Sequence, residues 1–560
     1  MTPATREQWR ELAREALRNS GRDVESPERA LATTTYDGIA IAPLHDATDL
    51  PETLGLPPSA ARTPGAPWEV RQRHEVADPE AVLADLENGV DSLWLAVAPH
   101  DLPRLLKGVH LDLISIVLDA GNRTREAADT VLALADGRPL RGCLGADPIG
   151  HAVRHGTNPD MSCMIELAHR CANALPGMRA IVVDATPYHE AGGGDAEELG
   201  CSIATGLTYL RELTGNGFSI REAFGQLEFR YAATADQFAT IAKLRAARML
   251  WARVAEVCGG PPSQLQHAVT SAAMMTRRDP WTNMLRTTLA SFAAGVAGAD
   301  AVTVRPFDDA LGLPDGFSQR IARNTSALLV EEVHTAKVAD PAGGSWYAER
   351  LTADLADKAW QWFQEIEEAG GMPEALGVIK DRLAATQAQR SRDIARRRTP
   401  IVGVSQYPHL TETPPMHTPT QSTPEGALPR IRYAQDFEDL RDLADAQSAR
   451  PRVFLAAIGP VGEHSARVSF AESLFHAGGI ETATGRPDYF AASGATVACL
   501  CSSDRLYDDH ATAVAKALRA AGAKRIWLAG RDRYDGVDAN LYAGCDVLDV
   551  LRTTLLEVGA

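Results

Sequence analysis

Short apolar runs alternate with longer amphipathic stretches between about residues 80 and 340, and this alternation limits the possible folds more than any other feature of the chain. The stretches Arg123–Ala135, Glu197–Leu213 and Ala235–Val257 have helical periodicity. Strands that are apolar on both faces and separated by helices form parallel βα units, and a segment of this length fits a (β/α)8 barrel. The predicted strands are Leu93–Val97, Leu113–Leu118, Leu140–Leu144, Ala180–Val183 and Ala301–Val304.

The same alternation returns in residues 451–560, where strands and helices follow one another without interruption. This order is typical of a small doubly wound domain. We therefore predict an α/β chain in which a TIM barrel is followed by a flavodoxin-like domain. The predicted elements are the strands Val453–Ile458, Thr496–Leu500 and Arg525–Leu528 and the helices Ser465–His476 and Ala511–Ala520.

Two segments fall outside these patterns. The chain begins with an amphipathic helix carrying Trp9 and Leu12 on one face, followed from Ile39 to Val70 by a stretch rich in proline and glycine. A later segment contains seven prolines from Pro400 to Pro429, which is typical of a linker. The predicted domains are a partner-wrapping segment at 1–75, the barrel at 76–384, the linker at 385–450 and the C-terminal α/β domain at 451–560.

The composition excludes several classes of protein. Lys and Arg number 56 against 73 Asp and Glu, and the resulting net charge of −17 repels nucleic acids and anionic membranes. Eight cysteines without a C-x-x-C pair indicate neither a zinc ribbon nor a disulfide framework. The charged N-terminus differs from a secretory signal, and we expect no membrane-spanning segment. We therefore expect a cytoplasmic protein with neither nucleic acid nor membrane as partner.

Four local patterns could contribute chemistry, each with a simpler alternative. His151 and His155 have the i, i+4 spacing of zinc ligands, but no third ligand is nearby and ordinary surface or loop histidines are favoured. Gly192–Gly194 could bring backbone amides to an anion, although a tight turn explains the run equally well. Tyr188, His189 and Glu190 follow a predicted barrel strand, where an acid/base cluster or a structural histidine would lie. Lys243, Arg245 and Arg248 could bind an anionic substrate or form ordinary salt bridges.

Five segments of the chain closely resemble the cobalamin-dependent acyl-CoA mutases, above all the methylmalonyl-CoA mutase family. The resemblance covers nearly the whole chain and implies the predicted barrel and C-terminal domain. It identifies Phe229–Trp251 with the family's long barrel helix. The segments are Phe229–Trp251, Thr35–Leu44, Gly200–Leu210, Phe317–Thr325 and Asp340–Tyr347.

The family interconverts methylmalonyl-CoA and succinyl-CoA through radicals formed from adenosylcobalamin. Its C-terminal domain binds the corrin through Asp-x-His-x-x-Gly, in which the histidine ligates cobalt and the aspartate holds that histidine. Aligning the helix that follows puts Pro460, Gly462 and Ser465 at these three positions, so the resemblance implies that the ligand set is lost. His464 could replace the axial ligand only if the loop were shifted.

The resemblance implies losses in the barrel as well. Thr186 and Pro187 stand where catalytic members have a Tyr-His pair before Glu-Ala-Gly, and Ser162 falls at the position of the substrate-carboxylate arginine. Residues Val76–Val97, which correspond to a polar stretch along the acyl-CoA channel, indicate a plain helix and strand.

The resemblance therefore implies the small subunit of a heterodimeric bacterial enzyme, which pairs with a catalytic large subunit that binds adenosylcobalamin. For this chain we expect no catalytic, cofactor-binding or metal-binding residues. One alternative is a self-sufficient acyl-CoA mutase with a remodelled cobalamin site at His464. Another is a barrel enzyme with unrelated chemistry at Tyr188, His189 and Glu190.

Overall fold

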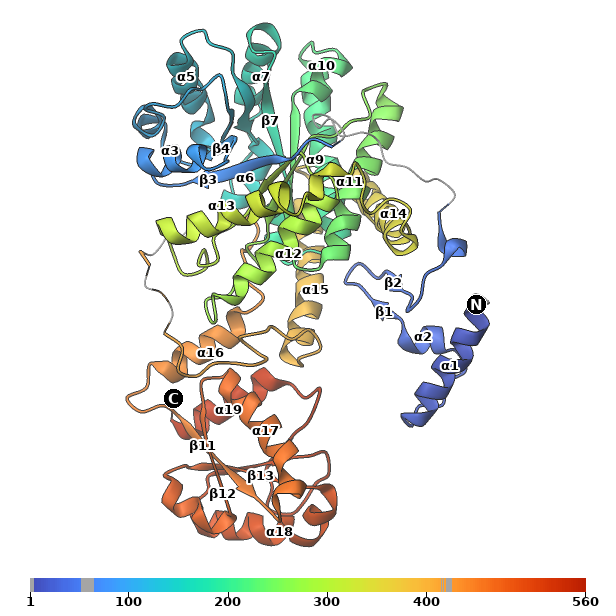
Figure 1. Cartoon of the computed structure of the whole chain (residues 1–560), viewed down its shortest axis with the longest axis vertical. Helices are drawn as coiled ribbons and strands as arrows, with labels where there is room; N and C mark the ends of the chain where they lie inside the picture. The colour runs from blue at the N-terminus through green and yellow to red at the C-terminus, as the bar shows by residue number, and fades with distance from the viewer. Residues whose placement is uncertain (1–4, 52–64, 414, 416, 419–425, 560) are drawn as a thin grey trace.

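A computed structural model describes residues 5–51, 65–413, 415, 417–418 and 426–559 (Figure 1). Its largest part is a closed barrel of parallel strands in the order β10-β3-β4-β5-β6-β7-β8-β9, which confirms the predicted fold. The strands are β3 (Glu69–His74), β4 (Ser92–Leu95), β5 (Ser115–Leu118), β6 (Arg141–Ala146), β7 (Met178–Asp184), β8 (Leu227–Ala233), β9 (Gln266–Thr270) and β10 (Ala301–Thr303).

Helices surround the barrel and bury its outer face. Phe229 on β8 packs edge-on against Trp251 on α11, with ring centres 4.6 Å apart. Gly206 on α9 allows this packing, because a Cβ there would lie 2.9 Å from the Trp251 ring. The helices are α3 (Pro79–Glu87), α4 (Leu102–Leu105), α5 (Thr124–Ala135), α6 (Pro148–His155), α7 (Ser162–Ala174), α8 (Thr186–Glu190), α9 (Asp195–Gly215), α10 (Ile220–Gly225), α11 (Gln237–Cys258), α12 (Thr282–Val296), α13 (Gly316–Glu331), α14 (Trp346–Glu368) and α15 (Leu376–Ala395).

Two sequence expectations need correction. The barrel's first strand, β3, begins at Glu69, ahead of the expected boundary at residue 76. The sequence did not predict this short strand because it directly follows the proline-rich stretch. The segment Phe229–Trp251 is not one helix, since Phe229–Ala233 lie in β8 and α11 begins only at Gln237. Arg230 and its charged neighbour alternate with apolar residues in this strand, whereas an ordinary buried strand is apolar throughout.

The C-terminal domain has a parallel sheet in the order β12-β11-β13-β14-β15 with helices on both faces. This is the predicted doubly wound, flavodoxin-like topology, with separate apolar cores on the two sides of the sheet. The elements are β11 (Arg452–Ala457), α17 (Val461–Ala477), β12 (Glu481–Gly485), β13 (Val497–Cys501), α18 (Asp504–Ala520), β14 (Arg525–Ala529), β15 (Ala539–Leu541) and α19 (Val547–Val558).

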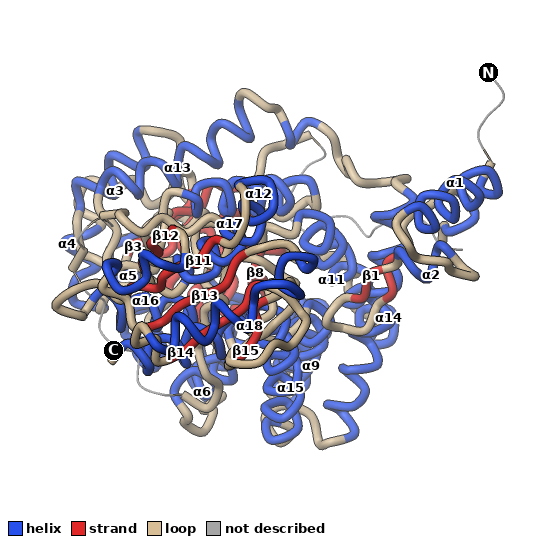
Figure 2. Tube along the Cα trace, turned by 90° about the horizontal axis from the view of Figure 1, so that it is seen from below, coloured by secondary structure: helices blue, strands red, loops and turns tan. Residues whose placement is uncertain are grey.

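The N-terminal residues 5–50 form an arm that projects from the barrel (Figures 1 and 2). On α1, Leu12 is exposed, Trp9 is half-buried and Leu17 is buried. Of the prolines expected along this segment, Pro57, Pro58 and Pro64 lie outside the described residues. The arm contains α1 (Arg6–Asn19), α2 (Pro27–Leu31), the antiparallel strands β1 (Thr33–Thr34) and β2 (Ala40–Ile41), and the short helix η1 (Ala47–Asp49).

The linker between the domains is partly helical, with α16 (Gln435–Asp445) inside it. Glu438 on α16 accepts a hydrogen bond from Arg277 Nε at 3.2 Å, and this bond fastens the linker to the loop after β9. Arg432, within the linker, pairs with the same carboxylate. Its prolines at 414, 419 and 424 lie outside the described residues. No helix in the described ranges is long and apolar enough to cross a membrane.

Candidate functional site

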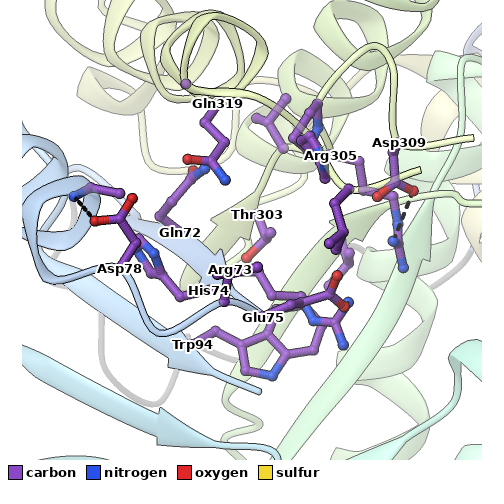
Figure 3. A pocket seen from close by; sticks show the side chains of 18 residues that line it. Gln72, Arg73, His74, Glu75, Asp78, Trp94, Thr303, Arg305, Asp309 and Gln319 are labelled. Atoms are coloured by element: carbon purple, nitrogen blue, oxygen red, sulfur yellow. Dashed lines mark hydrogen bonds and ion pairs between the residues drawn. The ribbon is translucent and has the colours of Figure 1, made fainter. Parts of the chain in front are cut away.

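The carboxyl ends of β3, β4, β9 and β10 surround a cavity of about 200 Å³ at the mouth of the barrel (Figure 3). Gln72 and Gln319 lie on one side, Arg73 and Glu75 lie on the other, and Trp94 lies beneath them. TIM-barrel enzymes place their chemistry at this end of the strands, so this cavity is the first candidate for an active site.

The barrel axis below the cavity is filled by a layer of side chains. The guanidinium of Arg230 lies 4.1 Å from the centre of the Trp94 ring, and the His267 ring meets it edge-on at 5.3 Å. Val117, Cys143, Val182 and Val269 pack with Trp94 in the same buried cluster. The inward-facing side chains therefore form a packed core rather than a channel.

Charged groups inside the barrel are paired with one another. Asp184 accepts hydrogen bonds from Arg154 at 2.6 Å and from Arg230 at 2.7 Å. Burial by itself would raise the pKa of Asp184, but the two guanidiniums outweigh burial and hold the pKa below its usual value. Arg71 and Glu228 form a second buried ion pair. These groups stabilise one another's charge and are not poised for proton transfer near neutral pH.

His267 lies between these ion pairs, hydrogen-bonded to Thr303 at 2.8 Å and to Arg230 at 3.2 Å. Burial, reinforced by Arg71 and Arg230, lowers its pKa well below the usual value, so the ring is neutral. Sequence reasoning missed this network. Its only signal was the presence of charged residues within the apolar strands β8 and β9.

The candidate cluster Tyr188, His189 and Glu190 lies on α8 at the end of β7, but the three side chains have separate environments. His189 Nε2 is 2.6 Å from Ser271 Oγ, and burial together with Lys243 lowers the His189 pKa to about 3. Glu190 accepts a hydrogen bond from Arg430 at 3.1 Å. Burial raises the pKa of Tyr188 well above its usual value. The three residues therefore do not converge on one cavity.

Thr186 and Pro187, the residues at the Tyr-His positions, contribute to local structure. Thr186 Oγ1 donates to Asp184 at 2.6 Å, and Pro187 lies in the first turn of α8. Ser162 begins α7 on the outside of the barrel and is exposed. Residues 76–97 contain α3 and β4, as expected for a plain helix and strand.

The glycine run does not offer free amides to an anion. The N–H groups of Gly192 and Gly193 donate to the carbonyls of His189 and Tyr188, and that of Gly194 donates to Glu197. Gly192 adopts a φ of 96°, which favours glycine. The simpler interpretation, a tight turn ahead of α9, fits these contacts.

The basic residues of α11 are buried and paired. Lys243 Nζ lies 2.7 Å from Glu198 and 2.8 Å from Asp195. Arg245 pairs with Asp340 and Glu349. Arg248 Nη1 donates to the side-chain oxygen of Gln266 at 2.7 Å. The three side chains therefore form salt bridges and hydrogen bonds inside the core, and they are not available to bind an anionic substrate.

His151 and His155 lie one turn apart on α6, with ring centres separated by 4.4 Å. Burial lowers the pKa of both side chains. Within the described residues, no group of three or more His, Cys, Asp or Glu side chains could hold a metal ion. The pair thus has the spacing of metal ligands without a third donor among these residues.

The positions expected to bind a corrin lie between β11 and α17 and in the first turns of α17. Only Ile458, Gly459 and Pro460 separate β11 from α17, so Gly462 and Ser465 lie inside the helix and not on a loop. Glu463 on α17 also pairs with Arg505 at 2.9 Å across the switch point between β11 and β13. Pro460, Gly462 and Ser465 therefore supply neither a lower axial ligand for cobalt nor a carboxylate to support one.

His464 lies in the first turn of α17 and is half-buried. Among the described residues, its buried Nδ1 has no hydrogen-bond partner. An axial ligand normally has its second nitrogen held by a carboxylate or carbonyl, and His464 lacks that support here.

Comparisons with known proteins agree with one another. A family model described as methylmalonyl-CoA mutase matches residues 65–457. The chain is 53% identical to the methylmalonyl-CoA mutase small subunit of Streptomyces virginiae, over 99% of this chain and 97% of the relative. It is 39% identical to the small subunit of Propionibacterium freudenreichii subsp. shermanii, over 99% and 95%. It is 30% identical to the methylmalonyl-CoA mutase of Cereibacter sphaeroides, over 72% of this chain and 65% of that relative.

Proposed function

The chain belongs to the methylmalonyl-CoA mutase family, and from this premise we propose that it is the non-catalytic small subunit of an adenosylcobalamin-dependent mutase. Its partner is a homologous large subunit that binds the cofactor and interconverts methylmalonyl-CoA and succinyl-CoA. Relatives at 53%, 42% and 39% identity, each aligned over 95% or more of its length, are named as small subunits, which supports this assignment.

The filled barrel axis is the observation that carries the proposal. A ligand pocket for a drug-sized molecule spans about 300–1,000 Å³. The cavity over the barrel axis is about 200 Å³, and Trp94 with Arg230 closes the axis beneath it. A larger crevice of about 710 Å³ lies between the arm, the linker and α12, and neither Trp94 nor Arg230 lines it. An extended acyl-CoA cannot enter this core unless the indole and its buried ion pairs move apart, which would expose uncompensated charge.

The C-terminal domain supports the same proposal. The switch point of a doubly wound sheet is its usual ligand site, and here the Glu463–Arg505 pair bridges it. Of the positions that would bind the corrin, Pro460 is the N-cap of α17 and Gly462 and Ser465 lie inside this helix, so they form no histidine–carboxylate pair. The cofactor therefore belongs to the partner in this proposal, and no step is assigned to this chain.

Association with the large subunit is the role that remains. The projecting arm with Leu12 exposed is one contact surface, as the sequence predicts. Permanent hetero-complexes bury about 2,000 Å² or more, so the arm would be only part of the interface. The eight cysteines are unpaired thiols, as expected for a cytoplasmic complex.

Co-expression with the homologous large subunit tests the proposal. We expect one size-exclusion peak containing both chains in equal amounts, and mutase turnover by that complex in the presence of adenosylcobalamin. The isolated small chain should give no turnover and retain no cobalamin absorbance after dialysis. Turnover by the isolated chain, or separate monomer peaks at micromolar concentration, would contradict the proposal.

A further inference from the structure

We propose that an uncharged apolar stripe on α12, formed by Trp281, Leu285 and Leu289, is a second docking surface for the catalytic large subunit, together with the crevice beside it. This inference rests on the proposed function, because it assigns the same partner to a surface distinct from α1.

The stripe follows the helical repeat. Trp281 caps α12, and Leu285 and Leu289 follow at successive steps of four residues, so the three side chains share one face. Leu285 is 67% exposed and Leu289 is 43% exposed. A single exposed leucine is ordinary, but three large apolar residues in a row on one helix face mark an interaction site.

The stripe is also free of charge. Thr288 is the other exposed residue beside it on this part of α12. Arg286 lies close by but turns away, donating to the Val402 carbonyl at 2.6 Å and to Asn283 at 2.7 Å. Absence of charged groups distinguishes the core of a protein interface from ordinary surface, which is rich in Lys and Glu.

Aromatic side chains extend the stripe toward α13. Trp281 stacks on Phe307 with ring centres 4.8 Å apart, and Phe307 meets Phe317 edge-on at 6.2 Å. Trp281 and Phe317 are both exposed on one side. Rigid aromatic side chains held by neighbours in this way are typical of the residues that contribute most to binding.

At its other end the stripe forms one wall of a crevice of about 710 Å³. The opposite walls include Ile41 and Thr33–Asp37 of the arm and Ile401 and Val402 of the linker. The stripe is therefore continuous with the arm, and the two surfaces can contribute to one interface of the size that a permanent complex needs.

The crevice favours an apolar segment of a protein over a small polar ligand, because its charged groups already have partners. The Arg390 guanidinium lies 4.4 Å from the Tyr36 ring and 5.0 Å from the Tyr433 ring, and it donates to the Gly192 carbonyl. Asp195 is paired with Lys243 at 2.8 Å. The exposed residues of the crevice are the apolar Leu285, Leu289, Pro400 and Val402 and the polar Thr33, Thr34, Asp236, Gln389 and Thr399. We therefore assign an apolar anchoring segment of the large subunit to this crevice.

The test uses the full chain and the large subunit, with affinity measured by biolayer interferometry. The double variant Leu285→Glu/Leu289→Glu should weaken the complex at least 100-fold, because two carboxylates would be buried against apolar surface. The matched control is Leu556→Glu on α19, where the leucine is 75% exposed and far from the stripe in sequence; it should bind within threefold of the parent. Binding of the double variant within threefold of the parent overturns the inference.

Hydrogen exchange on the unmodified complex gives a measurement that does not depend on a variant folding. The amides of Leu285–Ser291 should exchange more slowly in the complex than in the free chain, and unchanged exchange there overturns the inference. Failure of the parent chain to bind the large subunit would instead refute the proposed function. Light scattering that shows a homodimer of the free chain, converted to monomer by the double variant, would assign the stripe to a second copy and also overturn the inference.

Discussion

Arg230 and Trp94 lie in contact inside the barrel, with the guanidinium carbon 4.1 Å from the centre of the indole ring. The two residues come from β8 and β4, on different sides of the barrel, so their contact spans the axis. A cation against an indole face in a dry interior is stabilising by roughly 2 kcal/mol or more. The contact thus favours a closed barrel and works against any ligand that would need to pass between the strands.

Replacing Trp94 with alanine should destabilise the chain by about 3–5 kcal/mol, since a large buried side chain leaves a cavity between guanidiniums. Arg73 also lies against the Trp94 ring, at 4.7 Å, so two cations lose their aromatic partner. Urea unfolding followed by tryptophan fluorescence measures the loss. The matched control is Trp346→Ala, where the tryptophan is half-exposed, and it should lower the free energy of unfolding by less than about 1 kcal/mol. Equal losses of unfolding free energy in the two variants would contradict a packed axis.

The Trp94→Ala variant also tests the role of the axis in function. If the filled core merely blocked an otherwise competent active site, opening it would give the isolated chain some mutase turnover. We expect no turnover, because the Tyr-His positions remain Thr186 and Pro187 and no cofactor site is restored.

Replacing Lys243 with methionine should destabilise the chain by about 3–5 kcal/mol, because removing one partner leaves buried carboxylates unpaired. Burial would lower the pKa of Lys243, but Asp195 and Glu198 outweigh burial and raise the pKa, so the amine is charged. Thermal unfolding at pH 7 measures the effect. Arg350→Met, which breaks an exposed pair with Asp354 one turn away, should change stability by about 1 kcal/mol or less.

Stability should fall on acidification in part through His189. Burial lowers its folded pKa to about 3 from an ordinary value of 6.5, so the unfolded chain binds the extra proton first. The contribution of this residue is therefore complete above pH 6.5 and is lost as the pH falls from 6.5 toward 3, at about 1.4 kcal/mol per pH unit. Urea midpoints of the parent and His189→Gln between pH 6.5 and 4.5 measure the difference. Parallel curves would show that His189 binds a proton equally well in both states.

The same His189→Gln variant separates structure from chemistry in the complex. If His189 is structural, turnover of the assembled complex should stay within a few-fold of the parent. Loss of a true general acid or base would lower turnover by about 10²–10⁴-fold. A loss of that size with the complex intact would return the cluster of Tyr188, His189 and Glu190 to consideration as an active site.

Restoring the corrin motif should fail to restore cobalamin binding. In the variant Pro460→Asp/Gly462→His/Ser465→Gly, the new histidine would lie within the first turn of α17, because three residues do not form the loop that a corrin requires. Equilibrium dialysis read by the visible absorbance of cobalamin measures binding, with His464→Ala in the parent background as the control. Stoichiometric binding by the parent chain that His464→Ala abolishes would support the self-sufficient mutase instead.

The sequence by itself determined the elements whose apolar periodicity is local. The alternating strands and helices predicted both the barrel and the doubly wound domain. Alignment with the family puts Pro460, Gly462 and Ser465 at the corrin-binding positions, and the loss of that site stays a prediction. Tertiary structure decided which partners the charged residues inside the strands have. Arg230 and His267 gave β8 and β9 a polar appearance, and only closure of the barrel brings them against Trp94 and Asp184. Likewise, the partners of Lys243 come from another helix, and the stripe on α12 is recognisable only once the opposite face of that helix is buried. The physical reason is that periodicity reports which face of an element is apolar, whereas pairing of charges depends on which distant elements share an interior.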